Sequence, residues 1–599
     1  MFTFNRRFRV PDALWVPLRI APVWGGLYLL FTVATALVPS LQILAIADFI
    51  RSVQTAVMER SGMIPLVLPA LSMFALMALQ MLLTPLRGFV DLRLQMRLRR
   101  TMRVAYLEKL NRLEYRHIES PEVWDIIDRL TLDFVKKFIY MEEKFSEMFG
   151  QMVRLIQVIV GVVSVVVVLT MQVWWLGLVM VVIAVPVLFL SYRFGGRDYD
   201  MGQSYLKYCR ASNNLGEVLL YRQYTFERFL FHFTPQVNKK WEKNYALIRR
   251  ELNRIVTKST AIVKLGGILN TLMAIVLILI MAFLVAQGAF TVAVFIPLVS
   301  ALFALSQTLS WEMSDCFYSV ARMQRFFVDL TQFALLSELE SKPTRDIDPG
   351  EFRTLEFREV RFRYPDTEIY VLDGVNLLLE RGRHYAFVGV NGAGKTTITK
   401  LIMGLYDDYE GEILLNGIEL RYIPLAKRKN LFTAVFQDFA KYEIPFEDNI
   451  RLGNPQATDA QIEQAVELVG LTEVAHGLPE GMRTTLGKLK EGGVEVSGGE
   501  WQRIAMARAV VNPAAVKILD EPTAALDPLS ESRVYEQFGE ISRDATTVYI
   551  SHRLGSTQLA DIIFVLENGR ITESGTHEEL MANRATYFAM YDSQRSWYV

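Results

Sequence analysis

The chain contains very little cysteine, and its charges balance. Only Cys209 and Cys316 occur among 599 residues, which excludes a disulfide framework. The 64 basic residues equal the 64 acidic ones, so no overall field attracts nucleic acid, and no nucleic-acid partner is expected. Long parts of the chain also lack charge altogether. Four stretches contain no Asp, Glu, Lys, Arg or His, namely Ile20–Ala47, Ser61–Leu86, Leu155–Tyr192 and Leu265–Trp311.

These uncharged stretches have the length of membrane spans. A spanning helix needs about 20 apolar residues, and soluble core helices seldom run so far without a charge. The first two stretches, of 28 and 26 residues, fit one span each, and the last two, of 38 and 47, fit two each. We place the turns at Gln172–Gly177, where paired tryptophans suit the membrane interface, and at Gln287–Ala289. The six predicted spans are approximately 20–47, 61–86, 150–171, 174–192, 262–286 and 290–312.

The basic residues predict the orientation of these spans. Arginine and lysine cluster before span one, after span two and after span four, whereas the intervening connections are short and poor in them. Because cytoplasmic loops carry the excess of positive charge, both termini are expected in the cytoplasm. We therefore predict a multi-pass protein of the cell's inner (cytoplasmic) membrane, with lipid as a partner.

Two long connections between spans are charged and helical in pattern. Residues Gly88–Lys144 and Arg193–Lys264 lack strand alternation and the glycine and proline punctuation of a small domain. They predict helices that continue from the membrane into the cytoplasm. The turns at their tips are expected near Ser120–Pro121 and near Ala211–Arg222.

A change of pattern divides the chain. The polar segment Glu338–Gly350 reads as a linker, and short apolar strands then alternate with amphipathic helical stretches. Such alternation is typical of an α/β domain with a largely parallel sheet. We predict a membrane domain over 1–325, a linker over 326–350 and an α/β domain over 351–599. The expected strands include Thr354–Phe362, Tyr385–Val388, Phe432–Phe436, Ala515–Leu519, Thr547–Ile550 and Ile562–Leu566.

A complete phosphate-binding loop lies in the α/β domain. Residues 389–397 read GVNGAGKTT, which satisfies G-x-x-x-x-G-K-[ST] between a predicted strand and a predicted helix. Its backbone N–H groups and the helix dipole suit phosphate, Lys395 can reach the β- and γ-phosphates, and Thr396 suits Mg²⁺. The sequence therefore predicts a nucleoside triphosphate and Mg²⁺ as ligands, and the family resemblance described below implies that the nucleotide is ATP. The nucleotide-binding residues expected in the loop are Gly389, Asn391, Gly392, Ala393, Gly394, Lys395, Thr396 and Thr397.

A second element of phosphate chemistry follows. The apolar strand at Val516 ends in Asp520 and Glu521. A carboxylate at the first position can hold Mg²⁺, while the next faces an attacking water. Lys517 interrupts the apolar run, and we expect its long side chain to snorkel toward solvent.

Between these elements, Val496-Ser-Gly-Gly-Glu500 resembles the LSGGQ signature of ATP-binding-cassette (ABC) proteins, with Val for Leu and Glu for Gln. Other family landmarks follow in order. The resemblance implies that Tyr364 stacks on adenine, that Gln437 meets Mg²⁺ and the water, that Asp527 lies in the D-loop and that His552 is the switch histidine. Glu521, His552, Lys395 and Gln437 are then the predicted catalytic residues, Thr396, Gln437 and Asp520 the metal ligands. The remaining nucleotide contacts are Tyr364, Gln437, Ser497, Gly498, Gly499, Asp527 and His552.

Six spans followed by one cassette resemble an ABC exporter half-transporter. The resemblance implies two chains, because each ATP lies between the loop of one cassette and the signature of the other. It also implies coupling helices at the cytoplasmic tips, with Glu491 near the partner's coupling helix. A homodimer is favoured, and a heterodimer with a degenerate partner remains open.

Two functions remain open at this point. The first is an exporter of an amphipathic or lipophilic solute, and the second is a membrane ATPase acting as an importer or regulator; a soluble cassette protein is excluded by the spans. The segments Phe436–Tyr442 and Gly498–Trp501 resemble those of bacterial peptide exporters. Glu312 and Asp315 share a helical face, which suits either a cavity for a cationic group or, as we favour, a solvated helix extension. Arg154 and Lys264 are expected to snorkel.

Overall fold

The computed structural model describes residues 2–59, 63–131, 141–172, 174–221, 224–287, 292–339, 347–365, 367–488, 492–520, 545–550 and 554–595. The chain forms two compact units. One contains Met1–Leu113 with Ser120–Leu336, and the other contains Glu114–Glu119 with Ser337–Val599. The division at Leu336 falls inside the predicted linker, whose first residues form the end of a long helix.

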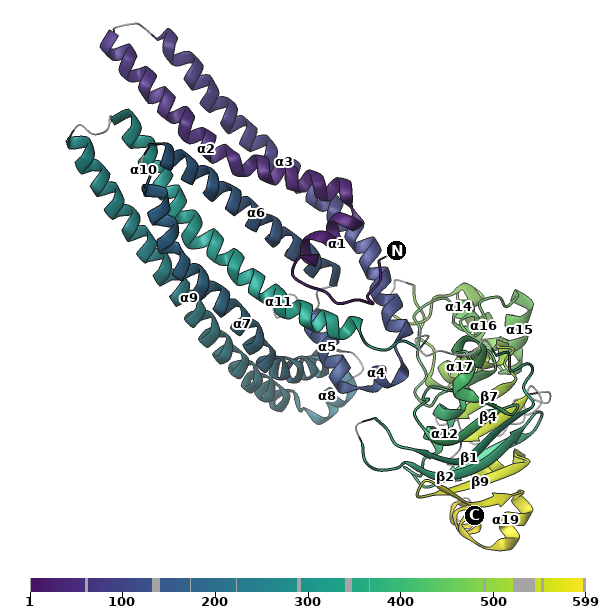
Figure 1. Ribbon diagram of the computed structural model, residues 1–599. Coiled ribbons are helices and arrows are strands. Elements are labelled where there is room, and N and C mark those ends of the chain that lie inside the picture. The colour runs from purple at the N-terminus through teal and green to yellow at the C-terminus, as the bar shows by residue number, and fades with distance from the viewer. Residues whose placement is uncertain are drawn as a thin grey trace. The chain divides into compact units, whose positions relative to one another are not determined.

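The first unit consists of long helices that run side by side (Figure 1). Helix α2 packs on α3 and α6, and α7 packs on α9 and α11. The helices are α1 (Asp12–Ile20), α2 (Pro22–Glu59), α3 (Ile64–Arg112), α5 (Pro121–Thr131), α6 (Met141–Gln172), α7 (Leu176–Leu220), α8 (Thr225–Phe231), α9 (Thr234–Ala286), α10 (Val292–Gln307), a π-helix (Thr308–Met313) and α11 (Ser314–Ala334).

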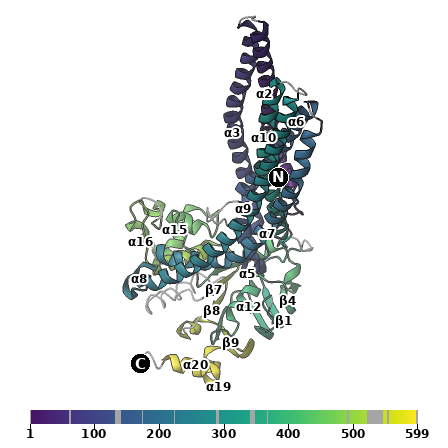
Figure 2. The same cartoon turned by 90° about the vertical axis from the view of Figure 1, so that its left-hand side faces the viewer.

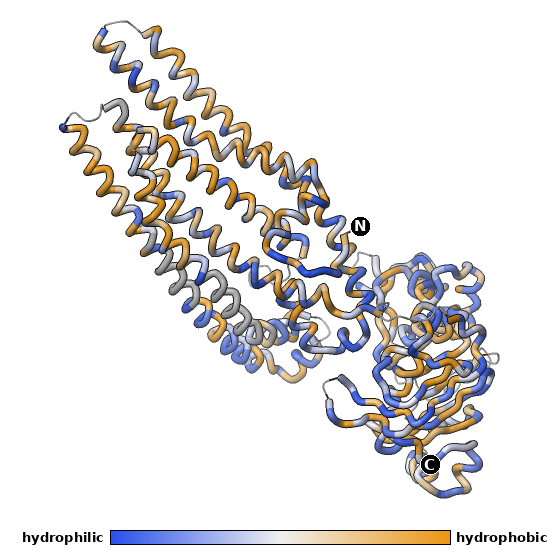
Figure 3. Tube along the Cα trace, viewed as in Figure 1, coloured by the Kyte–Doolittle hydropathy of each residue, from blue (hydrophilic) through white to orange (hydrophobic). Residues whose placement is uncertain are grey.

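Much of the apolar surface of these helices is exposed. Among the described residues, four helical segments are long and apolar enough to cross a membrane: Pro22–Glu59, Ile64–Arg112, Met141–Met171 and Gly267–Ala286. Gly177–Arg193 is a shorter apolar helix, and α10 supplies apolar residues within the sixth predicted span. Figure 3 shows the apolar colour along much of these helices. Side chains such as Leu68 and Phe74, 77% and 71% exposed, form an apolar surface that suits contact with lipid.

Three breaks between helices fall at predicted turns. Helix α6 ends at Gln172 and α7 begins at Leu176, and α5 begins at Pro121, a residue favoured at a helix start. At the second predicted tip, α7 ends at Leu220 with Tyr221 as its C-cap, inside the predicted range Ala211–Arg222, of which Arg222 lies outside the described residues. Gly216 does not break this helix; a Cβ there would lie 3.9 Å from Trp241 of α9. Helix α8 follows, and the left-handed His232 ends it.

The second unit is built on two sheets. The larger has the strand order β10-β9-β3-β8-β7-β6, in which only β10 is antiparallel to its neighbour. Its strands are β3 (His384–Gly389), β6 (Phe432–Val435), β7 (Val516–Asp520), β8 (Thr546–Ile550), β9 (Ile562–Glu567) and β10 (Arg570–Gly575). The predicted α/β fold is confirmed.

The first predicted strand does not join this sheet. Thr354–Phe362 is β1 of a separate antiparallel sheet of order β2-β1-β4-β5. Its burial changes from alternation at the start to exposed positions at Arg358 and Glu359, where the register shifts. Its partners are β2 (Leu372–Glu380), β4 (Glu410–Leu415) and β5 (Ile418–Glu419).

Both faces of the parallel sheet are covered. Along β3, Ala386 and Val388 pack into one core, and Tyr385 and Phe387 into the other, as expected for a strand whose side chains alternate. The helices are α12 (Lys395–Ile402), α13 (Leu425–Lys429), α14 (Phe446–Arg451), α15 (Asp459–Leu468), α16 (Thr472–Gly477), α17 (Gly498–Val511), α19 (His577–Asn583) and α20 (Thr586–Arg595), several of which Figure 2 shows from the side. The short helix α4 (Tyr115–Glu119) belongs to this unit as well.

Candidate nucleotide site

Two glycines of the phosphate loop occupy positions that no other residue fits. Gly389 ends β3 with φ +152°, and a Cβ there would lie 2.3 Å from the carbonyl oxygen of Leu566. Gly394 has φ +106°, and its Cβ would lie 2.7 Å from Leu372 Cδ2. Because both positions exclude a side chain, the backbone between them bends tightly and leads directly into α12. This is the strand, loop and helix arrangement that a phosphate needs.

The loop side chains divide into outward and inward groups. Thr396 is exposed at the first turn of α12, whereas Thr397 is buried and its hydroxyl lies 3.0 Å from the Tyr364 hydroxyl. The Lys395 ammonium donates to the carbonyl oxygens of Gly389 and Val390 at 2.9 and 3.1 Å. Lys395 therefore spans the loop from within. Asn391 and Gly392 are exposed, and Ala393 is buried.

Sheet topology gathers the other predicted residues at one edge. In a parallel sheet the carboxyl ends of the strands meet there, and ligands bind outside them. Asp520 ends β7 opposite Ile550 of β8, which in turn pairs with Phe387 just before the phosphate loop. Gln437 follows β6, the other neighbour of β7, and is exposed. Glu521, Asp527, His552 and Glu491 lie outside the described residues.

The signature segment forms the start of a helix. Ser497 is the N-cap of α17, and its hydroxyl accepts a hydrogen bond from the Glu500 N–H. The Glu500 carboxylate in turn accepts the Ser497 N–H at 2.6 Å, which completes a capping box. Ser497 and Gly498 are exposed. Glu500 can therefore cap the helix as the family's glutamine could, because the capping box uses only an acceptor oxygen of this side chain.

Lys517 does not snorkel as expected. The residue is 6% exposed, and its ammonium donates to the carbonyl oxygens of Ala509 and Val510 at 3.3 and 3.4 Å. These carbonyls end α17, where a helix favours a positive charge. Burial lowers the pKa of Lys517 to about 8. The lysine therefore joins the strand of Asp520 to the helix of the signature.

The charged residues near the predicted spans have partners in the helical unit. Arg154 forms an ion pair with Asp315 at 3.2 Å, and the Lys264 ammonium lies 3.1 Å from the centroid of the Trp311 ring. The snorkelling expected of both cations stays a prediction, and the carboxylate and the ring give each cation a partner. Deeper in the unit, the buried Asn270 amide donates to Ser310 at 2.9 Å, beside the π-helix.

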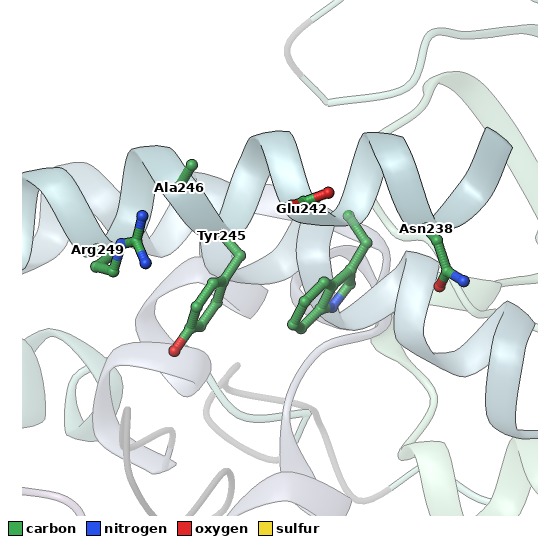
Figure 4. A pocket seen from close by; sticks show the side chains of 6 residues that line it. Asn238, Glu242, Tyr245, Ala246 and Arg249 are labelled. Atoms are coloured by element: carbon green, nitrogen blue, oxygen red, sulfur yellow. The ribbon is translucent and has the colours of Figure 1, made fainter. Parts of the chain in front are cut away.

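An open groove of about 400 Å³ lies along the polar N-terminal part of α9. It is lined by Asn238, Trp241, Glu242, Tyr245, Ala246 and Arg249, several of which Figure 4 shows along one helix. Trp241 and Tyr245 stack with their ring centroids 5.0 Å apart. Sequence reasoning did not select these residues, although an aromatic pair four positions apart on a helix was visible in it.

Comparison with known proteins agrees with this geometry. The family model for the ABC transporter matches residues 372–524, and the model for the ABC transporter transmembrane region matches residues 26–197. The chain belongs to the ABC transporters, with a membrane domain fused to a nucleotide-binding cassette. Its cassette binds ATP, and the chain is an ATP-hydrolysing transporter of multi-pass membrane type whose half-transporter fold implies dimerisation.

Individual relatives point to the exporter branch. The chain is 27% identical over 569 residues to the subtilin transport ATP-binding protein SpaT of Bacillus subtilis, covering 94% of this chain and 90% of the relative. It is 38% identical over 240 residues to a putative multidrug export ATP-binding/permease protein of Staphylococcus aureus, covering 40% of this chain and 41% of that protein. A bacterial Atm1-family ABC exporter with ATP bound has the same fold, with a TM-score of 0.76, 21% identity and coverage of 95% and 98%. The chain is thus an exporter-type half-transporter, and the importer alternative is not favoured.

Proposed function

We propose that the chain is an ATP-driven exporter that moves an amphipathic or lipophilic solute out of the cytoplasm by alternating access. The observation that carries the proposal is the pairing of one phosphate-loop cassette with long helices whose exposed apolar surface suits lipid. Few fixed charges line these helices, and Arg154, Lys264 and Asp315 have partners, which suits such solutes better than small ions. The names of the relatives, subtilin transport and multidrug export, support outward movement. Peptides and drugs rank first, then lipids.

We assign the chemistry to the edge of the parallel sheet. Lys395 and the loop amides stabilise charge on the phosphates, and Glu521 acts as general base or positions the attacking water. Gln437 and His552 orient the water and the γ-phosphate, and Tyr364 stacks on adenine. The Mg²⁺ ligands are Thr396, Gln437 and Asp520, whose oxygen donors are those that this ion prefers. The ion would neutralise phosphate charge.

Two chains form the working unit in this proposal, with a homodimer favoured. A chain has one phosphate loop and one signature, and the exposed Ser497 and Gly498 suit contact with the nucleotide of the other cassette. Asp527 completes that contact in the D-loop. We place both termini and the cassettes on the cytoplasmic side of the inner membrane, with domain bounds of 1–325, 326–350 and 351–599. Mass measurement of the purified complex distinguishes a homodimer, a heterodimer and a monomer.

The experiment that tests this function uses the purified chain in reconstituted membranes. ATPase activity is measured against a panel of peptides, lipids and cationic dyes, with Glu521→Gln as the control. We expect at least one panel member to stimulate the wild type, and the variant to bind ATP but turn over orders of magnitude more slowly. Near-normal hydrolysis by Glu521→Gln would refute the catalytic role of Glu521. Unchanged ATP affinity in Lys395→Ala would refute the role of Lys395 in phosphate binding.

A further inference from the structure

Tyr364 is held in place by the helix that follows the phosphate loop. Helix α12 carries Thr397 and Lys400 three positions apart, so the two side chains lie on one face. The Thr397 hydroxyl lies 3.0 Å from the Tyr364 hydroxyl, and the Lys400 ammonium lies 5.3 Å from the centroid of the Tyr364 ring. The ring also makes edge contacts with Phe362 and Tyr406 at centroid distances of 5.2 and 5.7 Å. Tyr364 is therefore fixed both at its hydroxyl and at its ring.

Lys400 is itself anchored by a residue far away in the sequence. Its ammonium forms an ion pair with the Glu119 carboxylate at 2.6 Å and lies 5.6 Å from the centroid of the Tyr115 ring. Glu119 also accepts a hydrogen bond from the Tyr406 hydroxyl. With side-chain exposures of 18% for Lys400 and 35% for Glu119, the pair is partly shielded from water.

Both members of this pair are charged at neutral pH. Burial would raise the pKa of Glu119, but hydrogen bonds from Lys400 and Tyr406 lower it overall. Burial would lower the pKa of Lys400, but Glu119 and the neighbouring tyrosines raise it overall. A cation beside an aromatic ring is attracted to the ring face, so the ion pair also orders the rings around it.

Glu119 ends a segment that joins two helices of the other unit along the chain. Residues Glu114–Glu119 lie between α3 and α5 in sequence, yet they pack within the cassette unit. Arg116 fastens the same segment to Asp408 at 3.1 Å. Any change in how this segment docks therefore acts on Glu119, and through it on Lys400.

We propose that Lys400 is a positioning residue that couples the orientation of Tyr364 to the docking of Glu114–Glu119 through Glu119. The proposal rests on the proposed function, in which Tyr364 stacks on adenine. When the segment is docked, Glu119 holds Lys400 against the tyrosine ring, and the ring is ready for the base. By linkage, nucleotide binding then strengthens docking by the same factor as docking strengthens nucleotide binding.

The test separates the adenine contact from the phosphate contact. Equilibrium affinities for ATP and for inorganic tripolyphosphate, which lacks a base, are measured on the full chain in nanodiscs. We expect Lys400→Met to weaken ATP binding about two- to fivefold, the size of one cation–π contact, and to leave the affinity for tripolyphosphate unchanged. Lys400→Arg keeps the cation and should restore ATP affinity. The matched control is Arg381→Met, which removes an exposed ion pair with Glu351 in the same unit.

A double-mutant cycle tests the coupling to the segment. Glu119→Gln should also weaken ATP binding, and it should raise the KM for ATP without lowering kcat. The double variant with Lys400→Met should bind ATP no more weakly than Lys400→Met alone. An unchanged ratio of ATP to tripolyphosphate affinity in Lys400→Met would overturn the proposal, as would additive effects in the double variant.

A Tyr364 variant distinguishes a failure of the coupling through Lys400 from a failure of the assigned role of Tyr364. Loss of a base stacked on an aromatic ring costs about 5- to 150-fold in affinity, so Tyr364→Ala should weaken ATP by that range and spare tripolyphosphate. If Tyr364→Ala leaves the ratio unchanged, the assigned role of Tyr364 in the proposed function fails. If Tyr364→Ala shifts the ratio and Lys400→Met does not, only the coupling proposal fails.

Discussion

Lys517 places an ammonium group in the cassette core, and its replacement should change how stability depends on pH. Burial lowers the pKa of this lysine from 10.5 to about 8 in the folded chain. Between these two pH values the unfolded chain binds more protons than the folded chain. The contribution of Lys517 to the free energy of unfolding therefore rises with pH over that window and is flat outside it.

The magnitude follows from the two pKa values. Each pH unit of difference corresponds to about 1.4 kcal/mol, so the full effect is about 3 kcal/mol. Between pH 7 and pH 9.5 the expected part is about 2 kcal/mol, since the upper end of the window is not reached. For a domain of this size, that gain corresponds to a rise of roughly 4–8 °C in melting temperature.

The assay compares Lys517→Met with the wild type in thermal unfolding of the full chain in nanodiscs. Methionine keeps the length and flexibility of the side chain and removes the titrating group. Because all other groups are shared, the difference between the two melting curves isolates Lys517. From pH 7 to pH 9.5 the melting temperature of the wild type should rise relative to that of Lys517→Met. The melting temperature of Lys441→Met, a variant at an exposed position, should change with pH as that of the wild type does. Parallel curves for wild type and Lys517→Met would refute the burial argument.

Two further predictions concern the nucleotide site. Gly389→Ala should abolish ATP binding in a titration, because its Cβ would meet the Leu566 carbonyl oxygen at 2.3 Å; Gly392→Ala, with nothing within 4 Å, should cost only about 1 kcal/mol of stability. Equal losses in the two variants would contradict the steric reasoning. Glu500→Ala should lower stability by about 0.5–2 kcal/mol because the capping box is lost, while Glu500→Gln retains an acceptor and should melt within 1–2 °C, roughly, of the wild type. A Glu500→Gln variant as unstable as Glu500→Ala would show that the charge, and not the acceptor, matters.

The parts of the site that could be predicted from the sequence are those formed by residues adjacent in the chain. The phosphate loop from Gly389 to Thr397 and the helix cap at Ser497 depend on neighbouring residues, so their form follows from the motif. Strand order then adds what spacing alone cannot, because it sets Gln437 and Asp520 at the ends of adjacent strands. The apolar spans were equally visible, since their signal is a run of uncharged residues.

Contacts between distant segments were not predictable in the same way. Glu119 and Lys400 lie in different halves of the chain, and no local pattern marks either one. Lys517 was expected to snorkel because its side chain is long, and only the position of the end of α17 reveals its carbonyl partners. The end of α7 at Leu220 falls inside the range predicted for the second tip, but the short helix α8 that follows it was not predicted.

The central claim is outward, ATP-driven transport, and a flux measurement tests it most directly. Inverted membrane vesicles, with the cassettes outside, are loaded externally with a compound that stimulates the ATPase, and ATP is added. The account predicts accumulation inside the vesicles for the wild type and none for Glu521→Gln. It is contradicted if no stimulating compound accumulates, or if Glu521→Gln vesicles accumulate it as fast as the wild type.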